Sequence, residues 1–570
     1  MEQKKWVYKY SALSREKILD FAKECDIPAV MAVVYLNRGI DSKDALEKYL
    51  KKSLESVYNP MLLHDMQESC QRIKSAIDEG EKITIYGDYD ADGVTSTSIL
   101  YMFLKEQGAD VSYYIPDRFR EGYGLNIMAV NRISKTGTKL LITVDCGIVS
   151  TGEVQLAKAQ GMDVIITDHH TPGEKLPETL VIHPRLGEDY PFGELAGVGV
   201  AFKLILGLGM TLGLKSGEVF AKYADIAAIG TIADVVDLKD ENRVIADRGI
   251  KLLRHTKNYG IAALTEVAGV KPETLNSTSV AFGISPRINA AGRMASAADA
   301  VELILSQSRE DAYKKALILD ENNRSRRSIE SKIFDEALAM IEKDVNFGAK
   351  KVIVLAGEGW HHGVIGIVAA RILEKFYKPC ILISSENGLG KGSARSIPGF
   401  NMFDALSDSS ELLTKFGGHS QAAGLSLSMS QFDEFEKRIN KYAEKVLTDE
   451  DMIKKIEIDC KIRLSDVSPQ TIRMIDGLEP FGMGNEKPIF AVTGAKVAAI
   501  AKMGADGKHL RIRISDGRRL INCVGFSMGE LADEIGEGDS VDIAFSMEIN
   551  EFNGTKNLQL MLKDVRKSEV

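Results

Sequence analysis

The sequence lacks several features that mark specialised classes of protein. It contains six cysteines but no Cys-x-x-Cys pair, which argues against a disulfide framework or a zinc–thiolate site and indicates a reducing compartment, the cytoplasm. It has no apolar run of about 18 residues, and its first stretch, MEQKKWVYKY, is not a signal peptide, so no membrane segment is predicted. Solenoid repeats and low-complexity tracts are also absent.

The composition is that of an ordinary globular protein. Of the 570 residues, 44% are hydrophobic and 27% are charged, and the formal net charge is −9. A chain of this length is expected to form about three or four domains. An acidic protein can bind nucleic acid only through local basic grooves, so the composition alone indicates no partner.

The rest of the chain is organised around residues 82–98, KITIYGDYDADGVTSTS. The β-branched residues before Gly87 predict a short buried strand, and the residues after Gly93 predict a helix. Between them stand Asp88, Asp90 and Asp92 at alternate positions. Because crowded acids repel each other unless a cation neutralises them, this turn predicts a site for Mg2+ or Mn2+.

This acidic turn has two other interpretations. An EF-hand loop also begins D-x-D-x-D-G, but it needs a glutamate at its twelfth position, where this chain has Ile99, and a preceding helix. The calcium loop is therefore rejected. A solvated acidic turn remains the alternative when the stretch is taken alone.

Two later predicted strands, 139–144 and 162–167, also stop at polar residues. Between about residues 70 and 240 such strands alternate with helices, which predicts a parallel sheet with helices on both faces. Ligands bind outside the carboxyl ends of such strands, so these side chains are expected to converge on a two-metal site. The residues after the two strands are Asp145, Asp168, His169 and His170.

Asp234 lies in the otherwise apolar run 230–238, where a lone carboxylate is costly to bury unless it is paired or bound to metal. A capping or salt-bridged acid is the alternative there. For His169 and His170, each taken alone, a structural histidine is the usual interpretation. Their position directly after an acid at a strand end favours a functional role.

Taken together, four motifs in this chain resemble the four motifs of the DHH phosphoesterase superfamily. They are DYDADG at 88–93, the isolated Asp145, DHH at 168–170 and the aspartate of GTIADVV at 230–236. The chain closely resembles the bacterial single-strand exonucleases of that superfamily, over essentially its whole length. The resemblance implies an α/β fold, with a parallel-sheet DHH domain, a smaller α/β DHH-associated domain joined by a long helix, and a C-terminal OB-fold β-barrel. Asp237, where many relatives have proline, and the extra His361 depart from the family pattern.

Apolar residues at i, i+4 spacing within 306–344 predict the long connecting helix. The leader is expected to pack against the domain that follows it. The expected domains are a helical leader (1–60), the DHH catalytic domain (61–305), the connecting helix (306–347), the DHH-associated domain (348–450) and an OB-fold nucleic-acid-binding domain (451–570).

Three more motifs resemble further parts of the superfamily. They are SPRINAAGRM at 285–294, which carries Arg287 and Arg293 among small residues, and the glycine-containing motifs GKGSARS at 390–396 and FGGHSQAAG at 416–424. In the DHH-associated domain the last of these faces the metals across a narrow cleft that admits one strand. Glycines let a backbone approach a substrate closely, and arginine can hold a terminal phosphate. For GKGSARS and FGGHSQAAG, the alternative is that the glycines only serve turns and strand crossings.

The C-terminal segment HLRIRISDGRRL at 509–520 alternates apolar with basic residues. It predicts a strand with Arg511 and Arg513 on one face, a two-residue hairpin turn at Asp516-Gly517, and a second strand that restarts at Arg518. A basic face on a small β-barrel suits single-stranded backbone. The alternative is an ordinary solvated strand face, and residues 478–490, which resemble the family's entry into this barrel, favour binding.

The resemblance implies a metal-dependent exonuclease that hydrolyses single-stranded DNA from the 5′ end to nucleotide 5′-monophosphates, in DNA repair and recombination. Two Mn2+ or Mg2+ ions are expected, with Asp145 between them. The expected metal ligands are Asp88, Asp90, Asp92, Asp145, His169 and Asp234. The expected catalytic residues are His170, Asp168, which would orient a histidine, and His419. The expected substrate-binding residues are Arg118, Arg287, Arg293, Ser393, Arg395, Gly417, Gly418, Arg511 and Arg513.

Two rival functions remain open. One is a DHH phosphoesterase for short oligonucleotides, cyclic dinucleotides or pyrophosphate, which would not need the basic barrel. The other is a catalytically silent DNA-binding module, which the complete set of metal ligands disfavours. Besides single-stranded DNA, the resemblance implies a single-strand-binding protein and a helicase as partners and a monomeric chain.

Overall fold

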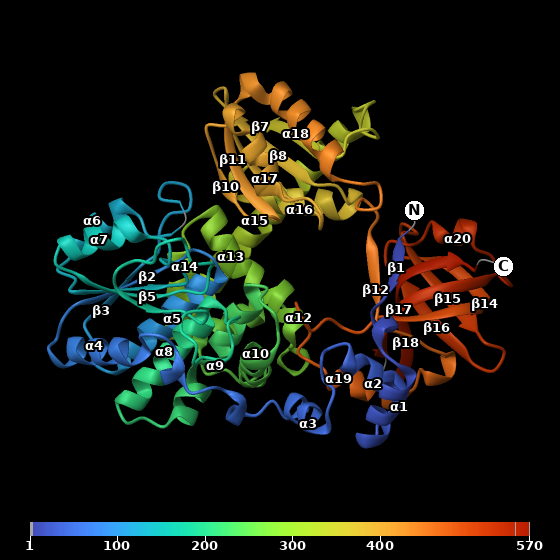
Figure 1. Cartoon of the computed structure of the whole chain (residues 1–570), viewed down its shortest axis with the longest axis horizontal. Helices are drawn as coiled ribbons and strands as arrows, with labels where there is room; N and C mark the ends of the chain where they lie inside the picture. The colour runs from blue at the N-terminus through green and yellow to red at the C-terminus, as the bar shows by residue number, and fades with distance from the viewer. Residues whose placement is uncertain (1–3, 123, 553–554, 569–570) are drawn as a thin grey trace. The chain divides into compact units, whose positions relative to one another are not determined.

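The structure is a computed structural model that describes residues 4–122, 124–552 and 555–568 (Figure 1). The chain forms two compact units. The smaller contains Arg287–Asp299 and Lys314–Lys455, and the larger contains Trp6–Pro286, Ala300–Tyr313 and Ile456–Val570. None of the helices in the described ranges is both long and apolar enough to cross a membrane.

The larger unit contains a five-stranded parallel sheet with the order β3-β2-β4-β5-β6. Its central strands β2 and β4 are buried along their whole length, as the apolar β-branched sequence predicted. The strands are β2 (Ile83–Gly87), β3 (Val111–Tyr114), β4 (Leu140–Val144), β5 (Asp163–Thr167) and β6 (Leu180–Ile182).

Helices cover both faces of this sheet, as predicted (Figure 1). Helices α6 (Ile127–Ser134) and α7 (Thr151–Ala159) share a core with Tyr86, Leu141 and Ile166 on one face. The opposite face is packed by α4 (Met66–Asp78), α5 (Ala91–Glu106) and α8 (Gly197–Thr211), and α9 (Ser216–Ala233) and α10 (Asp240–Leu253) pack behind them. Five further helices follow, namely α11 (Tyr259–Val267), α12 (Ser277–Ser279), α13 (Ser285–Met294), α14 (Ala298–Ile304) and the 35-residue α15 (Arg309–Lys343).

The C-terminal part of the larger unit is a closed barrel. Strand β14 pairs with both β15 and β17, so that β14, β15, β16, β18 and β17 form a ring. Strands β16 and β18 are parallel and the other pairs in the ring are antiparallel, which is the five-stranded OB-fold that the resemblance implied. The strands are β13 (Cys460–Lys461), β14 (Phe490–Met503), β15 (His509–Ser515), β16 (Leu520–Gly525), β17 (Ser540–Phe552) and β18 (Thr555–Lys567), with α19 (Pro469–Asp476) and α20 (Leu531–Glu534).

The alternation along β15 is confirmed, but the predicted hairpin turn is wrong. Arg511 and Arg513 are exposed between buried apolar residues. Ser515 pairs with Leu520, so four residues form the loop and the second strand begins at Leu520 rather than at Arg518. The Asp516 carboxylate accepts the backbone N–H groups of Arg518 and Arg519, and this side-chain turn holds both residues outside the ladder.

The leader packs against two neighbours, so the expectation that it packs against the domain that follows it is correct for only part of it. Residues 49–58 contact α10, where Arg243 donates to the carbonyl of Tyr49 at 2.6 Å and Glu241 accepts the backbone N–H of Tyr58 at 2.7 Å, whereas the earlier helices pack against the barrel. Residues of α2 (Ala29–Leu36) and of the barrel belong to one buried cluster, in which Val34 contacts the same core as Phe490 and Ile512. Strand β1 (Lys5–Tyr8) also pairs with β12 (Lys455–Ile458). The remaining helices of this segment are α1 (Arg15–Glu24) and α3 (Lys43–Lys51).

The smaller unit is a second α/β domain with the strand order β10-β11-β9-β8-β7. Helices α17 (Met402–Asp408) and α18 (Phe432–Val446) cover one face, and α16 (His362–Phe376) covers the other together with the last turns of α15. The strands are β7 (Ile353–Glu358), β8 (Cys380–Glu386), β9 (Leu389–Arg395), β10 (Lys415–Gly418) and β11 (Ala422–Ser428).

Candidate metal centre

The acids and histidines that follow separate strands lie together at the carboxyl edge of the parallel sheet. From β2 the chain passes to β3 on one side and then returns to β4 on the other side, so the strand order reverses at β2. Asp88 directly follows β2, Asp145 follows β4 and Asp168 follows β5. A reversal of this kind is where open α/β sheets bind their ligands.

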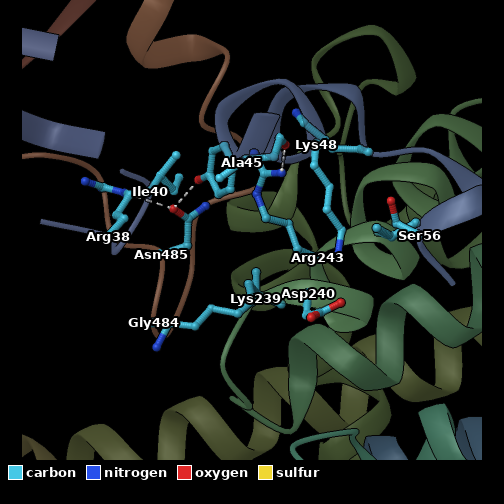
Figure 2. Close-up of a pocket in the computed structure, with 14 residues that line it drawn as sticks. Arg38, Ile40, Ala45, Lys48, Ser56, Lys239, Asp240, Arg243, Gly484 and Asn485 are labelled. Carbon is cyan, nitrogen blue, oxygen red and sulfur yellow. Dashed lines mark hydrogen bonds between the residues drawn. The ribbon is translucent and has the colours of Figure 1, made fainter. Parts of the chain in front are cut away.

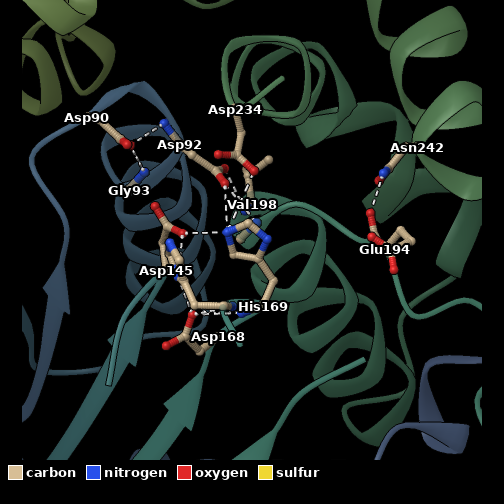
Figure 3. Close-up of polar contacts among 12 residues, drawn as sticks. Asp90, Asp92, Gly93, Asp145, Asp168, His169, Glu194, Val198, Asp234 and Asn242 are labelled. Carbon is tan, nitrogen blue, oxygen red and sulfur yellow. Dashed lines mark hydrogen bonds and ion pairs between the residues drawn. The ribbon is translucent and has the colours of Figure 1, made fainter. Parts of the chain in front are cut away.

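Three overlapping groups of side chains in this cluster have the composition of a metal site (Figure 3). In each group, the ligand atoms lie within 4.8 Å of one another. His169 Nε2 is 3.2 Å from Asp145 Oδ1, 3.6 Å from Asp234 Oδ2 and 4.0 Å from Asp92 Oδ2. The groups are Asp88–Asp90–Asp145, Asp92–His169–Asp234 and Asp145–His169–His170.

Four of these ligand atoms are buried without a hydrogen-bond partner among the described residues. They are Asp88 Oδ1, Asp145 Oδ1, His169 Nε2 and Asp234 Oδ2. A buried polar atom that lacks a partner costs about 1–3 kcal/mol, and more when it carries charge. Four such atoms facing one another fit one or more divalent cations, because carboxylate oxygens suit Mg2+ and Mn2+ and the neutral imidazole nitrogen suits Mn2+.

Asp90 and Asp92 are held by the starts of two helices. Asp90 caps α5, because its Oδ1 accepts the N–H groups of Asp92 at 2.9 Å and Gly93 at 3.1 Å. The two oxygens of Asp92 accept the N–H groups of Gly197 and Val198 at the start of α8, both at 2.7 Å. The positive end of α8 therefore fixes this carboxylate within the cluster.

Gly197 is a part of the site that the motif analysis missed. A Cβ atom at this position would stand 2.3 Å from Asp145 Oδ1, so only glycine leaves room for the carboxylate. Its sequence context, AGVGVAF at 196–202, contains no acid or histidine. The only available signal was a pair of glycines at the start of an apolar helix, and that pattern alone is weak.

Both carboxylate oxygens of Asp168 accept hydrogen bonds from neighbouring groups. Its Oδ1 accepts the backbone N–H groups of His169 and His170 and lies 2.7 Å from His170 Nδ1, and its Oδ2 accepts the N–H of Ile148. Although burial raises its pKa, these bonds hold the pKa of the Asp168 carboxyl below its usual value. Burial lowers the pKa of His170, but Asp168 outweighs it and the net shift is upward.

The other acids of the cluster are shifted in the opposite direction. Burial, followed by the neighbouring carboxylates, raises the pKa of Asp92 to about 7 and that of Asp234 to about 9. The pKa values of Asp88 and Asp145 are raised for the same reasons. Burial lowers the pKa of His169 to about 3, so this imidazole is neutral near pH 7 and has a lone pair to donate.

We expect the affinity for Mn2+ to rise with pH between about 6 and 9, because the acids with raised pKa values must lose protons when a cation binds. The folded, metal-free protein holds the protons of these acids more tightly than the unfolded chain does. Their contribution to its free energy of unfolding is therefore highest at low pH and is lost progressively as the pH rises through about 7 for Asp92 and about 9 for Asp234. Calorimetric titration near pH 7 in two buffers of different ionisation enthalpy should show proton release. An affinity that stays constant over this range would contradict the assignment.

Two residues of the site have left-handed backbone conformations that non-glycine residues rarely adopt. Asp145 has φ +59° and Val235, directly after Asp234, has φ +62°. Aspartate tolerates this region, whereas a β-branched valine is strained there. Strain of this kind persists only where the surrounding structure fixes the chain, and it concentrates at functional sites.

The remaining predicted site residues are distributed over other parts of the chain. The guanidinium of Arg118 lies 4.8 Å from the centre of the Tyr89 ring, and Tyr89 stands between Asp88 and Asp90, so Arg118 is near the cluster. Arg511 and Arg513 are exposed on the barrel. Asp237 and His361, the departures from the family pattern, belong to none of the three metal-ligand groups. In the smaller unit lie Arg287, Arg293, Ser393, Arg395, Gly417, Gly418 and His419.

Within the smaller unit, Arg287 forms an ion pair with Asp320 at 2.8 Å, and Arg293 donates to the carbonyl of Gly363 at 2.8 Å. Arg395 lies 3.3 Å from Ser393 Oγ, on strand β9. Both arginines of SPRINAAGRM are thus engaged by groups of the smaller unit.

Comparisons with known proteins agree with this fold. The sequence matches the descriptions "DHH family, N-terminal domain" over residues 82–231, "DHHA1 domain" over 349–445 and "RecJ OB domain" over 458–564. The parallel sheet, the cluster of acids and histidines at its edge and these three matches together identify the chain as a DHH phosphoesterase.

The chain is 42% identical to the single-stranded-DNA-specific exonuclease RecJ of Bacillus subtilis (strain 168), over 97% of this chain and 70% of that protein. Its structure resembles crystal structures of Thermus thermophilus RecJ in complex with Mn2+ (TM-score 0.85, 31% identity, 99% of this chain and 80% of that chain) and with Mg2+ (TM-score 0.80, 30% identity, 99% and 79%). The chain belongs to the RecJ family.

Proposed function

We propose that this chain is a metal-dependent exonuclease that hydrolyses single-stranded DNA from the 5′ end to nucleotide 5′-monophosphates, in DNA repair and recombination. The observation that carries the proposal is the set of four buried ligand atoms without hydrogen-bond partners among the described residues, at the edge where the strand order reverses. The B. subtilis relative is named a single-stranded-DNA-specific exonuclease, and the T. thermophilus relative was crystallised with Mn2+ and with Mg2+.

Two Mn2+ or Mg2+ ions would be held by the groups that share the edge of the sheet, with Asp145 between them. Asp88 and Asp90 would complete one site, and Asp92, His169 and Asp234 the other. When bound, such ions lower the pKa of water and stabilise the entering and leaving oxygens of an in-line displacement.

The protein's own groups would then bind and orient the strand. Asp168 fixes the ring of His170, whose Nδ1 lies 4.0 Å from Asp145 Oδ1 and whose side chain is 39% exposed. A histidine with a raised pKa at this position suits contact with a negatively charged scissile phosphate. By the resemblance, His419, Gly417 and Gly418 would contact a phosphate of the substrate. The 5′ phosphate and the backbone would be held by residues among Arg118, Arg287, Arg293, Ser393 and Arg395.

The basic face of the barrel separates an exonuclease from a small-substrate phosphoesterase. In the variant Arg511→Ala/Arg513→Ala, we expect binding of long single strands to weaken about tenfold and the slope of log affinity against log salt to fall by about 1.4, since each phosphate contact contributes about 0.7. Dinucleotide hydrolysis should stay within about twofold, because the metal cluster is untouched. Fluorescence anisotropy and product analysis measure the two effects.

Lys567→Ala is the matched control, because Lys567 is an exposed barrel cation already paired with Asp539. It should leave long-strand binding unchanged. Equal losses on long strands and dinucleotides in the double variant would instead favour the small-substrate function.

Digestion of end-labelled single-stranded DNA tests the proposed function as a whole. With Mn2+ or Mg2+, a 5′ label should appear at once as a mononucleotide, whereas a 3′ label should remain on a shrinking strand. Chelator should stop the reaction, and a duplex with blunt ends should resist it. Cleavage that persists in chelator, or that begins at the 3′ end, would contradict the proposal.

We further propose that the protein works in the cytoplasm as a monomer, beside a single-strand-binding protein and a helicase. All six cysteines are free thiols, which suits a reducing compartment. The resemblance to single-strand exonucleases supports the two partners.

A further inference from the structure

The turn that leads into the barrel lies directly against the loop that carries Asp234. We name residues 481–485 the junction turn and residues 234–239 the metal loop. The backbone N–H of Leu238 donates to the carbonyl of Met483 at 2.7 Å. A Cβ atom at Gly484 would stand 2.5 Å from Asp237 Cγ, and one at Gly482 would stand 2.7 Å from Leu238 Cδ1. Glycines at both positions therefore leave room for the side chains of Asp237 and Leu238 against the turn.

The junction turn is itself firmly anchored. Asn485 is 2% exposed, and its amide donates to the carbonyls of Leu478 and Pro480, both at 2.8 Å. Its Oδ1 accepts the hydroxyl of Tyr49 at 2.8 Å and Nε of Arg38 at 3.3 Å (Figure 2). A buried side chain that uses all of these bonds fixes the turn in one position.

The metal loop is held from its other side by helix α10. The side-chain amide of Asn242 donates to the carbonyls of Asp237 at 3.1 Å and Glu194 at 2.5 Å (Figure 3). Glu194 lies just before α8, whose first N–H groups hold Asp92. The loop of one expected metal ligand and the helix that fixes another are thus tied together by a single side chain.

The metal loop needs such support because its backbone is strained. Val235, at φ +62°, is 60% exposed, so its own side chain gains little from packing that would offset the strain. A cavity of about 310 Å3, bordered by Lys48, Lys239 and Gly484, lies beside the junction turn (Figure 2). The bonds of Asn485, rather than close packing on that side, therefore hold the turn in place.

We infer that the junction turn positions Asp234 for metal binding, with Met483 and Gly484 as positioning residues, and that the contact couples the barrel to the metal centre. The inference rests on the proposed role of Asp234 as a ligand. A strand engaged by the barrel would act on the metal loop through the junction turn, because only residues 486–489 separate the turn from β14.

Gly484→Ala tests the inference, because the added methyl group would collide with the carboxylate of Asp237. We expect kcat to fall on the order of tenfold on both long strands and dinucleotides, and Mn2+ affinity to fall by a similar factor, as outer contacts to metal ligands usually cost. The KM for long strands should stay within about twofold, since the barrel is unchanged. Calorimetry measures Mn2+ affinity independently of activity.

Gly494→Ala is the matched control for backbone strain. Gly494 has φ +71° against +68° for Gly484, but a Cβ atom there meets nothing within 4 Å. This variant should keep Mn2+ affinity and kcat. In Asp237→Ala/Gly484→Ala the colliding carboxylate is absent, so most of the lost affinity should return relative to Asp237→Ala alone.

Three results would overturn the inference. They are unchanged Mn2+ affinity in Gly484→Ala, equal losses in Gly494→Ala, and no recovery in the double variant. Asp234→Asn separates this inference from the proposed function. If Asp234→Asn loses Mn2+ affinity while Gly484→Ala keeps it, only the coupling is wrong, whereas retention in both variants refutes the ligand role itself.

Discussion

Asp145→Asn should abolish nucleotide release while making the metal-free protein more stable. Asp145 is 2% exposed, belongs to two of the three metal-ligand groups and has an oxygen without a hydrogen-bond partner among the described residues. Its loss should lower kcat by at least about a thousandfold, beyond the roughly 10–100-fold cost of losing an outer contact to a metal ligand. Asparagine also tolerates the left-handed backbone at this position, which alanine would strain.

The gain in stability follows from electrostatics. In the metal-free protein, Asp145 is buried beside Asp92, Asp90 and Asp234, and all of them raise its pKa. An asparagine needs no proton on burial and carries no charge beside these acids, so the free energy of unfolding should rise by about 1–3 kcal/mol, the usual range for one unsatisfied buried polar group. Thermal melts in chelator measure this, and added Mn2+ should stabilise only the parent protein.

Asp163→Asn is the control for the change of residue type, since Asp163 is an exposed acid at the start of β5. It should alter stability by no more than about 0.5 kcal/mol and leave kcat unchanged. Full activity in Asp145→Asn would refute the assignment. A loss of activity together with a lower melting temperature in chelator would instead indicate a structural role for Asp145.

Gly197→Ala should lower activity nearly as much as Asp145→Asn does, although glycine has no polar side chain. The new methyl group would lie 2.3 Å from Asp145 Oδ1, and the backbone cannot easily retreat because its N–H holds Asp92. We expect Mn2+ affinity to fall by tenfold or more and kcat by about a hundredfold, within the range of changes to the support of metal ligands. Calorimetry and single-strand digestion measure the two effects.

Gly199→Ala, on the same helix, is the matched control. Its Cβ would meet the end of the flexible Leu195 side chain at 3.2 Å, and alanine favours a helix over glycine by about 1 kcal/mol. It should fold well and retain activity. If Gly197→Ala behaves in the same way, the close approach of α8 to the metal centre has no functional role.

Most acids and the histidines of the metal centre could be predicted because they follow buried apolar strands, a pattern that local sequence carries. Asp234, which ends helix α9, could be predicted because it is an isolated acid in an apolar run. The support of these ligands could not be predicted in the same way. Gly197 lies 105 residues from Asp92, and only the folded chain shows that its N–H meets the carboxylate. Contacts between such distant positions leave no periodic signal.

In the barrel, too, some features could be predicted from the local sequence and others could not. The alternation along β15 correctly placed Arg511 and Arg513 on the exposed face. The Asp-Gly pair suggested a two-residue turn, but the Asp516 side chain satisfies two backbone N–H groups and favours a four-residue loop. The packing of α2 on the barrel was also missed, because an all-apolar helix does not indicate which neighbour covers it.

Anomalous diffraction from crystals soaked in Mn2+ tests most directly whether this cluster of acids exists to hold divalent cations. Two peaks are predicted, one contacted by Asp88, Asp90 and Asp145 and the other by Asp145, Asp92, His169 and Asp234. Both peaks should be absent from crystals of Asp145→Asn. Crystals of the active parent protein without any peak beside Asp145 and His169 would contradict the account.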